Sequence, residues 1–94
     1  MSLEQDLKKL LLDSMKAKDQ FTVGVVRMIN SKITERRTAK GFTGEVDDAV
    51  VLDVISAYKK AMQKAREEFA AVGEKGVTQV AELTAEIEFC ERFL

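Results

Sequence analysis

The stretch that decides the fold runs from residue 47 to residue 72 and reads DDAVVLDVISAYKKAMQKAREEFAAV. Its apolar residues recur every three or four positions over about seven turns, at Val51, Val54, Ile55, Tyr58, Ala61, Met62, Ala65, Phe69 and Val72. Asp47 can cap the start of this segment, and Gly73 follows it where a left-handed residue commonly ends a helix. A helix over 48–72 would be roughly 37 Å long at 1.5 Å per residue. The stretch therefore predicts one long amphipathic helix.

Three shorter segments also carry apolar residues at helical spacing, and they predict helices over residues 3–17, 20–37 and 78–94. Ser2 and Gln5 have the spacing of a capping box at the start of the first segment. Asp19 precedes the second segment as a candidate N-cap. Together with the long segment, they predict four helices.

One stretch of the second segment, residues 22–26 (TVGVV), suits a strand by composition. The 3.6-residue period that continues after it favours a helix instead. Residues 38–45 contain two glycines and read as a loop. We therefore predict a single all-α, four-helix domain over residues 1–94, with its first two helices antiparallel and the long third helix as its spine.

The composition excludes several classes of function. The 94 residues are 46 % hydrophobic and 33 % charged, with a net charge of −1, which supports a packed core. There is no His and only one Cys, so a Cys/His zinc site or a His-activated nucleophile is excluded. We expect no metal, no cofactor and no catalytic activity of the chain alone. The longest apolar run, 49–52, is far below the ~20 residues of a membrane span, and residues 1–30 lack a signal-peptide layout, so a cytoplasmic location is expected.

Basic residues gather on the second predicted helix and just beyond it. Within their span only one acidic residue, Glu35, opposes the group, which consists of Arg27, Lys32, Arg36, Arg37 and Lys40. Such a strip can hold the phosphates of an RNA backbone. The alternative is a solvated helix face whose cations lie near the helix C-terminus, where the helix dipole favours them.

A second basic group lies on the polar side of the long helix and consists of Lys59, Lys60, Lys64 and Arg66. Two glutamates follow it at once, Glu67 and Glu68, so charge pairing on a solvated surface accounts for the group. Lys60 remains a candidate RNA contact.

Two aromatic residues near the end of the chain stand apart from the apolar stripe of the last helix. Phe89 and Phe93 are four positions apart and lie about 200–240° around the helix from Ile87. Two apolar side chains on the polar face form a patch. Either the other helices cover both sides of this helix, or the patch contacts a second chain or a further domain. Phe89 and Phe93 are therefore a candidate partner interface.

Five segments, taken in order, resemble YqeY-like proteins: MKAKD at 15–19, VRMINSKI at 26–33, DDAVVL at 47–52, FAAVG at 69–73 and AEIEFCERFL at 85–94. The match spans essentially the whole chain. That family is related to the tail region of the B subunit (GatB) of the tRNA-dependent amidotransferase. The resemblance implies an all-helical N-terminal domain, normally followed by a smaller C-terminal helical domain. This second domain is expected to be lacking here, which would expose the phenylalanine patch.

The resemblance also implies a function. The related region of the B subunit contacts tRNA, while another part of the complex, a carbon–nitrogen ligase with glutamine as amide donor, performs the chemistry. Arg27 and Lys32 match the family pattern, whereas Ala61, Met62 and Gln63 stand where the family has further basic residues. The expected function is a non-catalytic tRNA-binding accessory domain. The alternative is a helical protein-interaction module that works through the phenylalanine patch.

Overall fold

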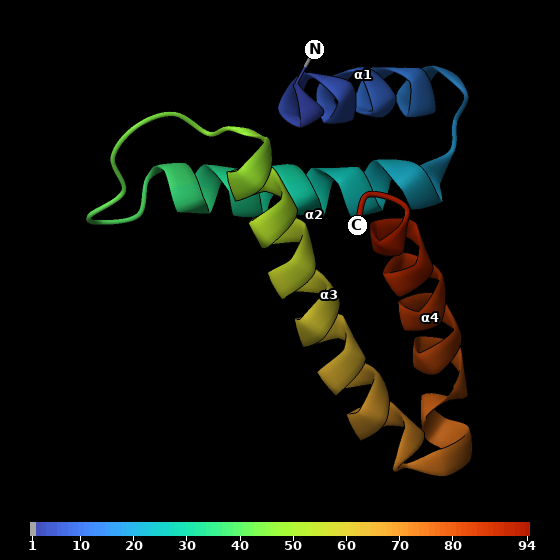
Figure 1. Ribbon diagram of the computed structural model, residues 1–94. Helices are drawn as coiled ribbons and strands as arrows, with labels where there is room; N and C mark the ends of the chain where they lie inside the picture. The colour runs from blue at the N-terminus through green and yellow to red at the C-terminus, as the bar shows by residue number, and fades with distance from the viewer. Residues whose placement is uncertain (1) are drawn as a thin grey trace. The chain divides into compact units, whose positions relative to one another are not determined.

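The structure is a computed structural model that describes residues 2–94, and it has no strand among them. Four α-helices and one 3₁₀ turn make up the described chain (Figure 1): α1 (Leu3–Lys16), α2 (Gln20–Arg37), α3 (Asp48–Ala70), η1 (Gly73–Gly76) and α4 (Val77–Glu91). The predicted all-α fold with a long third helix is confirmed. The chain forms two compact units, one ending at Val54 and the other running from Ile55 to Leu94.

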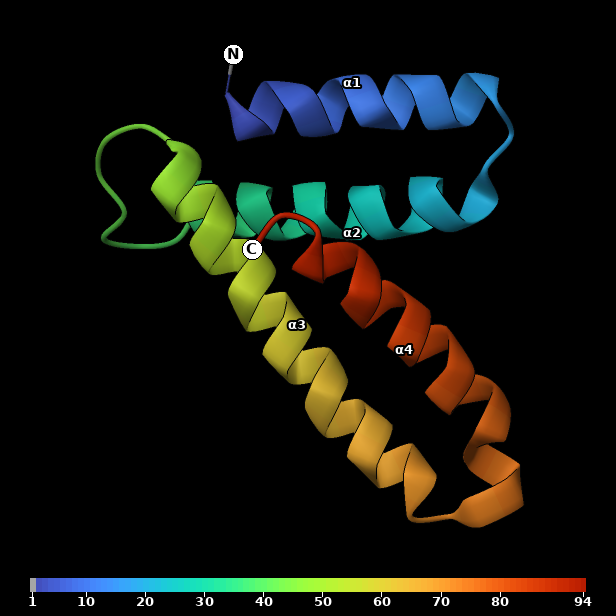
Figure 2. The same ribbon diagram turned by 45° about the vertical axis from the view of Figure 1, so that its right-hand side comes forward.

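In the first unit, α1 and α2 lie side by side and antiparallel, as expected (Figures 1 and 2). The capping box at the start of α1 is present. Ser2 Oγ accepts a hydrogen bond from the backbone N–H of Gln5 at 3.1 Å, and Gln5 Oε1 accepts one from the N–H of Ser2 at 3.2 Å. Asp19 caps α2 by accepting from the N–H of Thr22 at 3.1 Å. These side chains satisfy N–H groups that a helix start leaves without partners.

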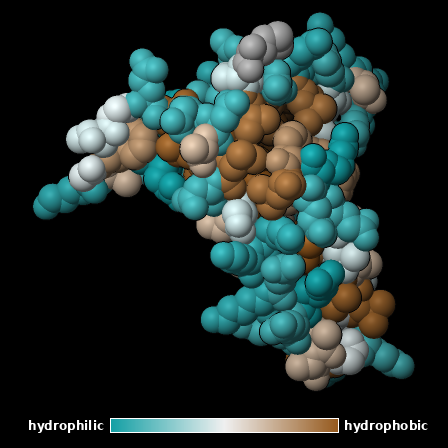
Figure 3. All heavy atoms as spheres, in the orientation of Figure 1, coloured by the Kyte–Doolittle hydropathy of each residue, from teal (hydrophilic) through white to brown (hydrophobic). Residues whose placement is uncertain are grey.

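Residues 22–26 belong to α2, so the helical period decides their conformation against their strand-like composition. Val25, Val26, Ile29 and Ile33 are buried. Phe21 and Met28 share the helical spacing of these residues, but their side chains are 45 % and 47 % exposed. The buried face includes Thr22 and Val26 in place of Phe21 and Met28, because tertiary packing decides which flank of a broad apolar stripe is covered. Figure 3 shows hydrophobic surface between α1 and α2 and hydrophilic side chains along the outer side of α1.

The start of α3 uses its acidic residues as backbone acceptors. Asp47 Oδ1 accepts from the N–H of Val50 at 3.0 Å, which is the predicted cap. Asp48 Oδ1 accepts from the N–H of Leu3 at 2.8 Å and so ties the first turn of α1 to the start of α3. The two carboxylates are therefore explained by helix capping.

In the second unit, the part of α3 from Ile55 onward and α4 form a helical hairpin joined by η1 (Figure 2). The third helix was expected to reach residue 72, but it ends at Ala70; Gly73 has the predicted left-handed conformation, with φ 66°. The fourth helix was expected over 78–94 and instead spans Val77–Glu91. The 3₁₀ turn explains the shift, because it brings Gly76 against the backbone of the last turn of α3.

Candidate nucleic-acid interface

Two arginines of the predicted RNA-binding strip have carboxylate partners. Arg36 Nη1 lies 2.8 Å from Asp53 Oδ2, and Arg37 Nη2 forms an ion pair with Glu4 Oε2. The arginine side chains are 36 % and 47 % exposed. Exposed pairs of this kind contribute about 0–1 kcal/mol to stability. The sequence shows only one acidic residue, Glu35, within the basic strip. In the structure, Asp53 and Glu4 also offset part of its positive charge.

The other predicted contacts lie in different surroundings. Arg27 is exposed on α2, and its guanidinium forms no ion pair or hydrogen bond with any of residues 2–94. Lys32 is partly buried on the same helix, and Lys40 is exposed in the loop that follows α2. Lys60 is exposed on α3, in the second unit. Four of the six expected residues therefore lie on α2, and at 100° per residue Arg27 and Lys32 lie about 140° apart around this helix.

In the second unit, charge pairing accounts for part of the other basic group. Lys59 Nζ lies 3.8 Å from Glu91 Oε2, and Arg66 Nη1 donates to Thr84 Oγ1 at 3.3 Å. Both contacts connect α3 to α4. Lys59 is paired with Glu91 of α4 and not with Glu67 or Glu68, which follow the group in sequence, while Arg66 serves as a hydrogen-bond donor between the two helices.

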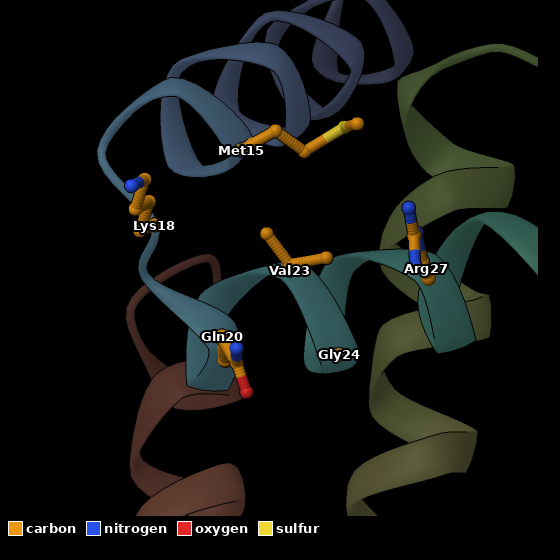
Figure 4. A pocket seen from close by; sticks show the side chains of 6 residues that line it. All are labelled: Met15, Lys18, Gln20, Val23, Gly24 and Arg27. Carbon is orange, nitrogen blue, oxygen red and sulfur yellow. The ribbon is translucent and has the colours of Figure 1, made fainter.

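A cavity lies between the end of α1 and the first half of α2 (Figure 4). It is open to solvent, has a volume of about 470 Å³ and is lined by Met15, Lys18, Gln20, Val23, Gly24 and Arg27. This volume lies within the ~300–1,000 Å³ that is typical of ligand sites. The four lining residues of α2 have i, i+3, i+4, i+7 spacing and so share one face of the helix. None of the lining residues is acidic.

The side chains divide the cavity into an apolar middle and two basic ends. Figure 4 shows Met15 extended along the gap between the helices and Val23 rising toward it, while Lys18 lies at the connecting turn and Arg27 at the opposite end. Among residues 2–94, neither Lys18 nor Arg27 has an ion-pair partner. Two unpaired cations therefore flank one apolar surface.

The conformation of Lys18 is unusual for a lysine. Its φ is 58°, in the left-handed region that glycine adopts most readily. The N–H of Lys18 donates to Met15 O at 3.2 Å, and the N–H of Asp19 donates to Ser14 O at 2.9 Å. This pair of hydrogen bonds is a Schellman motif, which ends α1. A non-glycine residue at this position costs about 1–2 kcal/mol in backbone strain.

Sequence reasoning selected Arg27 but not Lys18, Met15 or Gly24. A signal was present: Gly24 interrupts a helical segment, and Lys18 occupies the position after the first helix where glycine is usual. That Lys18 and Arg27 line the same cavity depends on the turn between the helices. Only the structure shows it.

The two phenylalanines of the predicted partner interface differ in exposure. Phe89 is only 4 % exposed, and Phe93 is partly buried. The ring centroids lie 5.5 Å apart at an interplanar angle of 57°, and the guanidinium of Arg92 lies 5.3 Å from the centroid of Phe89. The burial of Phe89 agrees with the alternative in which other parts of the protein cover this side of the helix. The contact of the patch with a second chain or a further domain stays a prediction. Phe93 remains partly accessible.

The second unit also contains the single thiol of the chain. Cys90 is buried, and desolvation, followed by the charge of Glu86, raises its pKa to about 11. Desolvation also raises the pKa of Tyr58 to about 12 and that of Glu86 above its usual range. Burial favours the neutral form of each group. A thiol with a raised pKa is a poor nucleophile, so Cys90 has the character of a core residue.

Residues that could form a metal site are not grouped anywhere in the described range 2–94. Within the same range, no helix is long and apolar enough to cross a membrane. The candidate site is thus the basic surface of α2 together with the cavity beside it.

The fold and the site together define a small all-helical protein with a local basic surface. A family model described as Yqey-like protein matches residues 3–94, so the chain belongs to the YqeY-like family. Searches among curated proteins and among solved structures found no match.

Proposed function

We propose that this protein is a non-catalytic RNA-binding accessory domain that contacts tRNA through α2. Membership of the YqeY-like family supports the proposal, because that family resembles the tRNA-contacting tail of the amidotransferase B subunit. The main structural support for the proposal is that the arginines of α2 differ in whether they have an ion-pair partner. Arg36 and Arg37 have carboxylate partners, whereas Arg27 has none among residues 2–94. An unpaired guanidinium on an exposed helix is available to bind phosphate.

The net charge of −1 limits the affinity of this interaction. With no global attraction, binding rests on local contacts, and we expect a dissociation constant in the ~10⁻⁴–10⁻⁶ M range of non-specific association. Each phosphate contact releases counterions, so the affinity should fall as salt rises.

The test is a titration of labelled deacylated tRNA at several salt concentrations with two matched variants. Arg27→Gln removes the unpaired cation, and Arg36→Gln removes a paired cation from the same helix by the same chemical change. We expect Arg27→Gln to make the slope of log K against log salt shallower by about 0.7–0.9 per lost phosphate contact. Arg36→Gln should have a smaller effect, since Asp53 already holds its guanidinium. No saturable binding at low salt, or identical curves for wild type and Arg27→Gln, would refute the proposal.

A further inference from the structure

The cavity between α1 and α2 combines features that suit one class of ligand. Its middle is apolar, with Met15 and Val23, and its two ends carry the cations Lys18 and Arg27 (Figure 4). An apolar ligand would leave the cations unused, and a bare anion would leave the apolar surface uncovered. A ligand with a flat apolar body and negative charge on either side uses both. Within an RNA strand, each base has a phosphate on both its 5′ and its 3′ side, which matches this arrangement.

Gly24 adds a second observation. A glycine inside a helix destabilises it, and it is commonly retained where another group approaches the backbone closely. In α2, however, a Cβ on Gly24 would meet nothing within 4 Å. Packing within the protein therefore does not require glycine here. Its effect is to leave backbone bare on the cavity wall, where a planar ring can lie against it.

Lys18 adds a third. It adopts a left-handed conformation that favours glycine, and among residues 2–94 its ammonium group has no ion-pair partner that would offset the strain. Backbone strain at non-glycine residues gathers at functional sites, and it supports a functional hypothesis when observed. One cavity is therefore lined by three residues with unexplained features. Lys18 has a strained backbone, Gly24 is not required by packing, and Arg27 has no ion-pair partner among residues 2–94.

We infer that this cavity binds a single unstacked nucleotide, with its base against Met15, Val23 and the backbone of Gly24 and its flanking phosphates on Lys18 and Arg27. The inference rests on the proposed function and deepens it: the RNA partner must present an unpaired, extruded base at this site. Sequence-specific recognition of RNA generally targets unstacked bases of single-stranded segments.

The test uses the full chain and a variant that fills the cavity without changing charge. Gly24→Leu places an isobutyl group on the cavity wall and improves helix propensity, so the fold should be retained. Ala81→Leu adds a leucine at an exposed position of α4, in the other unit, and serves as the matched control. The probes are a single-stranded oligoribonucleotide with one 2-aminopurine, a duplex RNA of equal charge, and adenosine 5′-monophosphate. Far-UV circular dichroism confirms that each variant is folded.

For wild type and Ala81→Leu, we expect binding of the single strand to change 2-aminopurine emission. Gly24→Leu should lose that change and bind the single strand about tenfold more weakly, while its affinity for the duplex is retained. Equal single-strand affinity of Gly24→Leu and wild type would overturn the nucleotide site and leave the proposed function standing. Absence of binding to either RNA would refute the proposed function. In that case, the binding of adenosine 5′-monophosphate decides the fate of the cavity. Saturable binding that Gly24→Leu abolishes would support the cavity as a site for a free nucleotide. No binding of adenosine 5′-monophosphate would overturn the nucleotide site as well.

Discussion

Gly76 provides the sharpest test of the hairpin in the second unit. It is buried at the end of η1, and a Cβ on it would lie 2.1 Å from the carbonyl oxygen of Phe69 and 2.8 Å from the carbonyl carbon. Unstrained contacts between carbon atoms are about 3.5–4.0 Å. The two nearest atoms belong to the backbone of α3, so they cannot rotate away as a side chain would. Gly76→Ala must therefore separate the turn from the last turn of the helix.

The cost of Gly76→Ala is steric alone, because its φ of −104° and ψ of 0° are accessible to alanine. Overpacking typically costs about 1–3 kcal/mol. We expect about 3 kcal/mol, the upper end of that range, since backbone must move. A domain of this size loses about 4–8 °C in Tm per kcal/mol, so Tm should fall by ~12–24 °C. Thermal and urea unfolding should be followed by circular dichroism and by the fluorescence of Tyr58, the only tyrosine, which lies in the same unit.

Two other glycines are matched controls for Gly76→Ala. Gly24→Ala meets nothing within 4 Å in a helix interior and should stabilise the protein by about 0.5–1 kcal/mol. Gly73→Ala also meets open space, but its φ of 66° is left-handed, so it should destabilise by about 1–2 kcal/mol. If Gly76→Ala unfolded at the same temperature as Gly73→Ala or above it, the close approach of η1 to the Phe69 carbonyl would be refuted.

Three further predictions concern single residues. The pKa of Asp19 is lowered by hydrogen bonds from the Thr22 hydroxyl and, second, from the Thr22 N–H. This cap therefore stabilises the fold above pH 3.8, and its contribution is lost as pH falls through the lowered pKa. Asp19→Asn should flatten that part of the pH dependence of the free energy of unfolding measured in urea. Because its pKa is raised from 9.0 to about 11, Cys90 should carry about a hundredfold less thiolate near neutral pH than an ordinary thiol. Iodoacetamide should therefore alkylate Cys90 more slowly in the folded protein than in the unfolded protein, by at least that factor. Equal rates would contradict the burial of Cys90. Lys18→Gly should raise the free energy of unfolding by up to about 1 kcal/mol in urea titrations, since glycine adopts the left-handed conformation without strain; a loss of stability would disprove that account.

Much of the fold was predictable because helices form through local interactions. The periodicity of residues 47–72 predicts a long helix, and capping by Ser2, Asp19 and Asp47 takes place within three residues of each cap. Helix ends were predicted less well. The end of α3 and the start of α4 depend on the fit of Gly76 against Phe69, and no periodicity encodes that fit.

The candidate site was predictable only in part. Arg27 was visible as a basic residue on a helix, but whether an arginine is paired depends on residues that are distant in the chain. Asp53 lies 17 positions from Arg36, and Glu4 lies 33 positions from Arg37. Glu4 lies on α1 and Asp53 lies near the start of α3. Both reach the arginines of α2 only when these segments pack together in the folded chain.

The sequence by itself determined the all-helical class, the family, and the absence of any histidine-based chemistry, because these follow from composition, period and motif order. Tertiary structure decided which groups are available on the surface. It buries Phe89, brings carboxylate partners to two arginines of α2, and sets Lys18 across a cavity from Arg27. The physical reason is that backbone conformation responds to neighbours within a few residues, whereas burial and charge pairing depend on segments that meet only after the chain has folded.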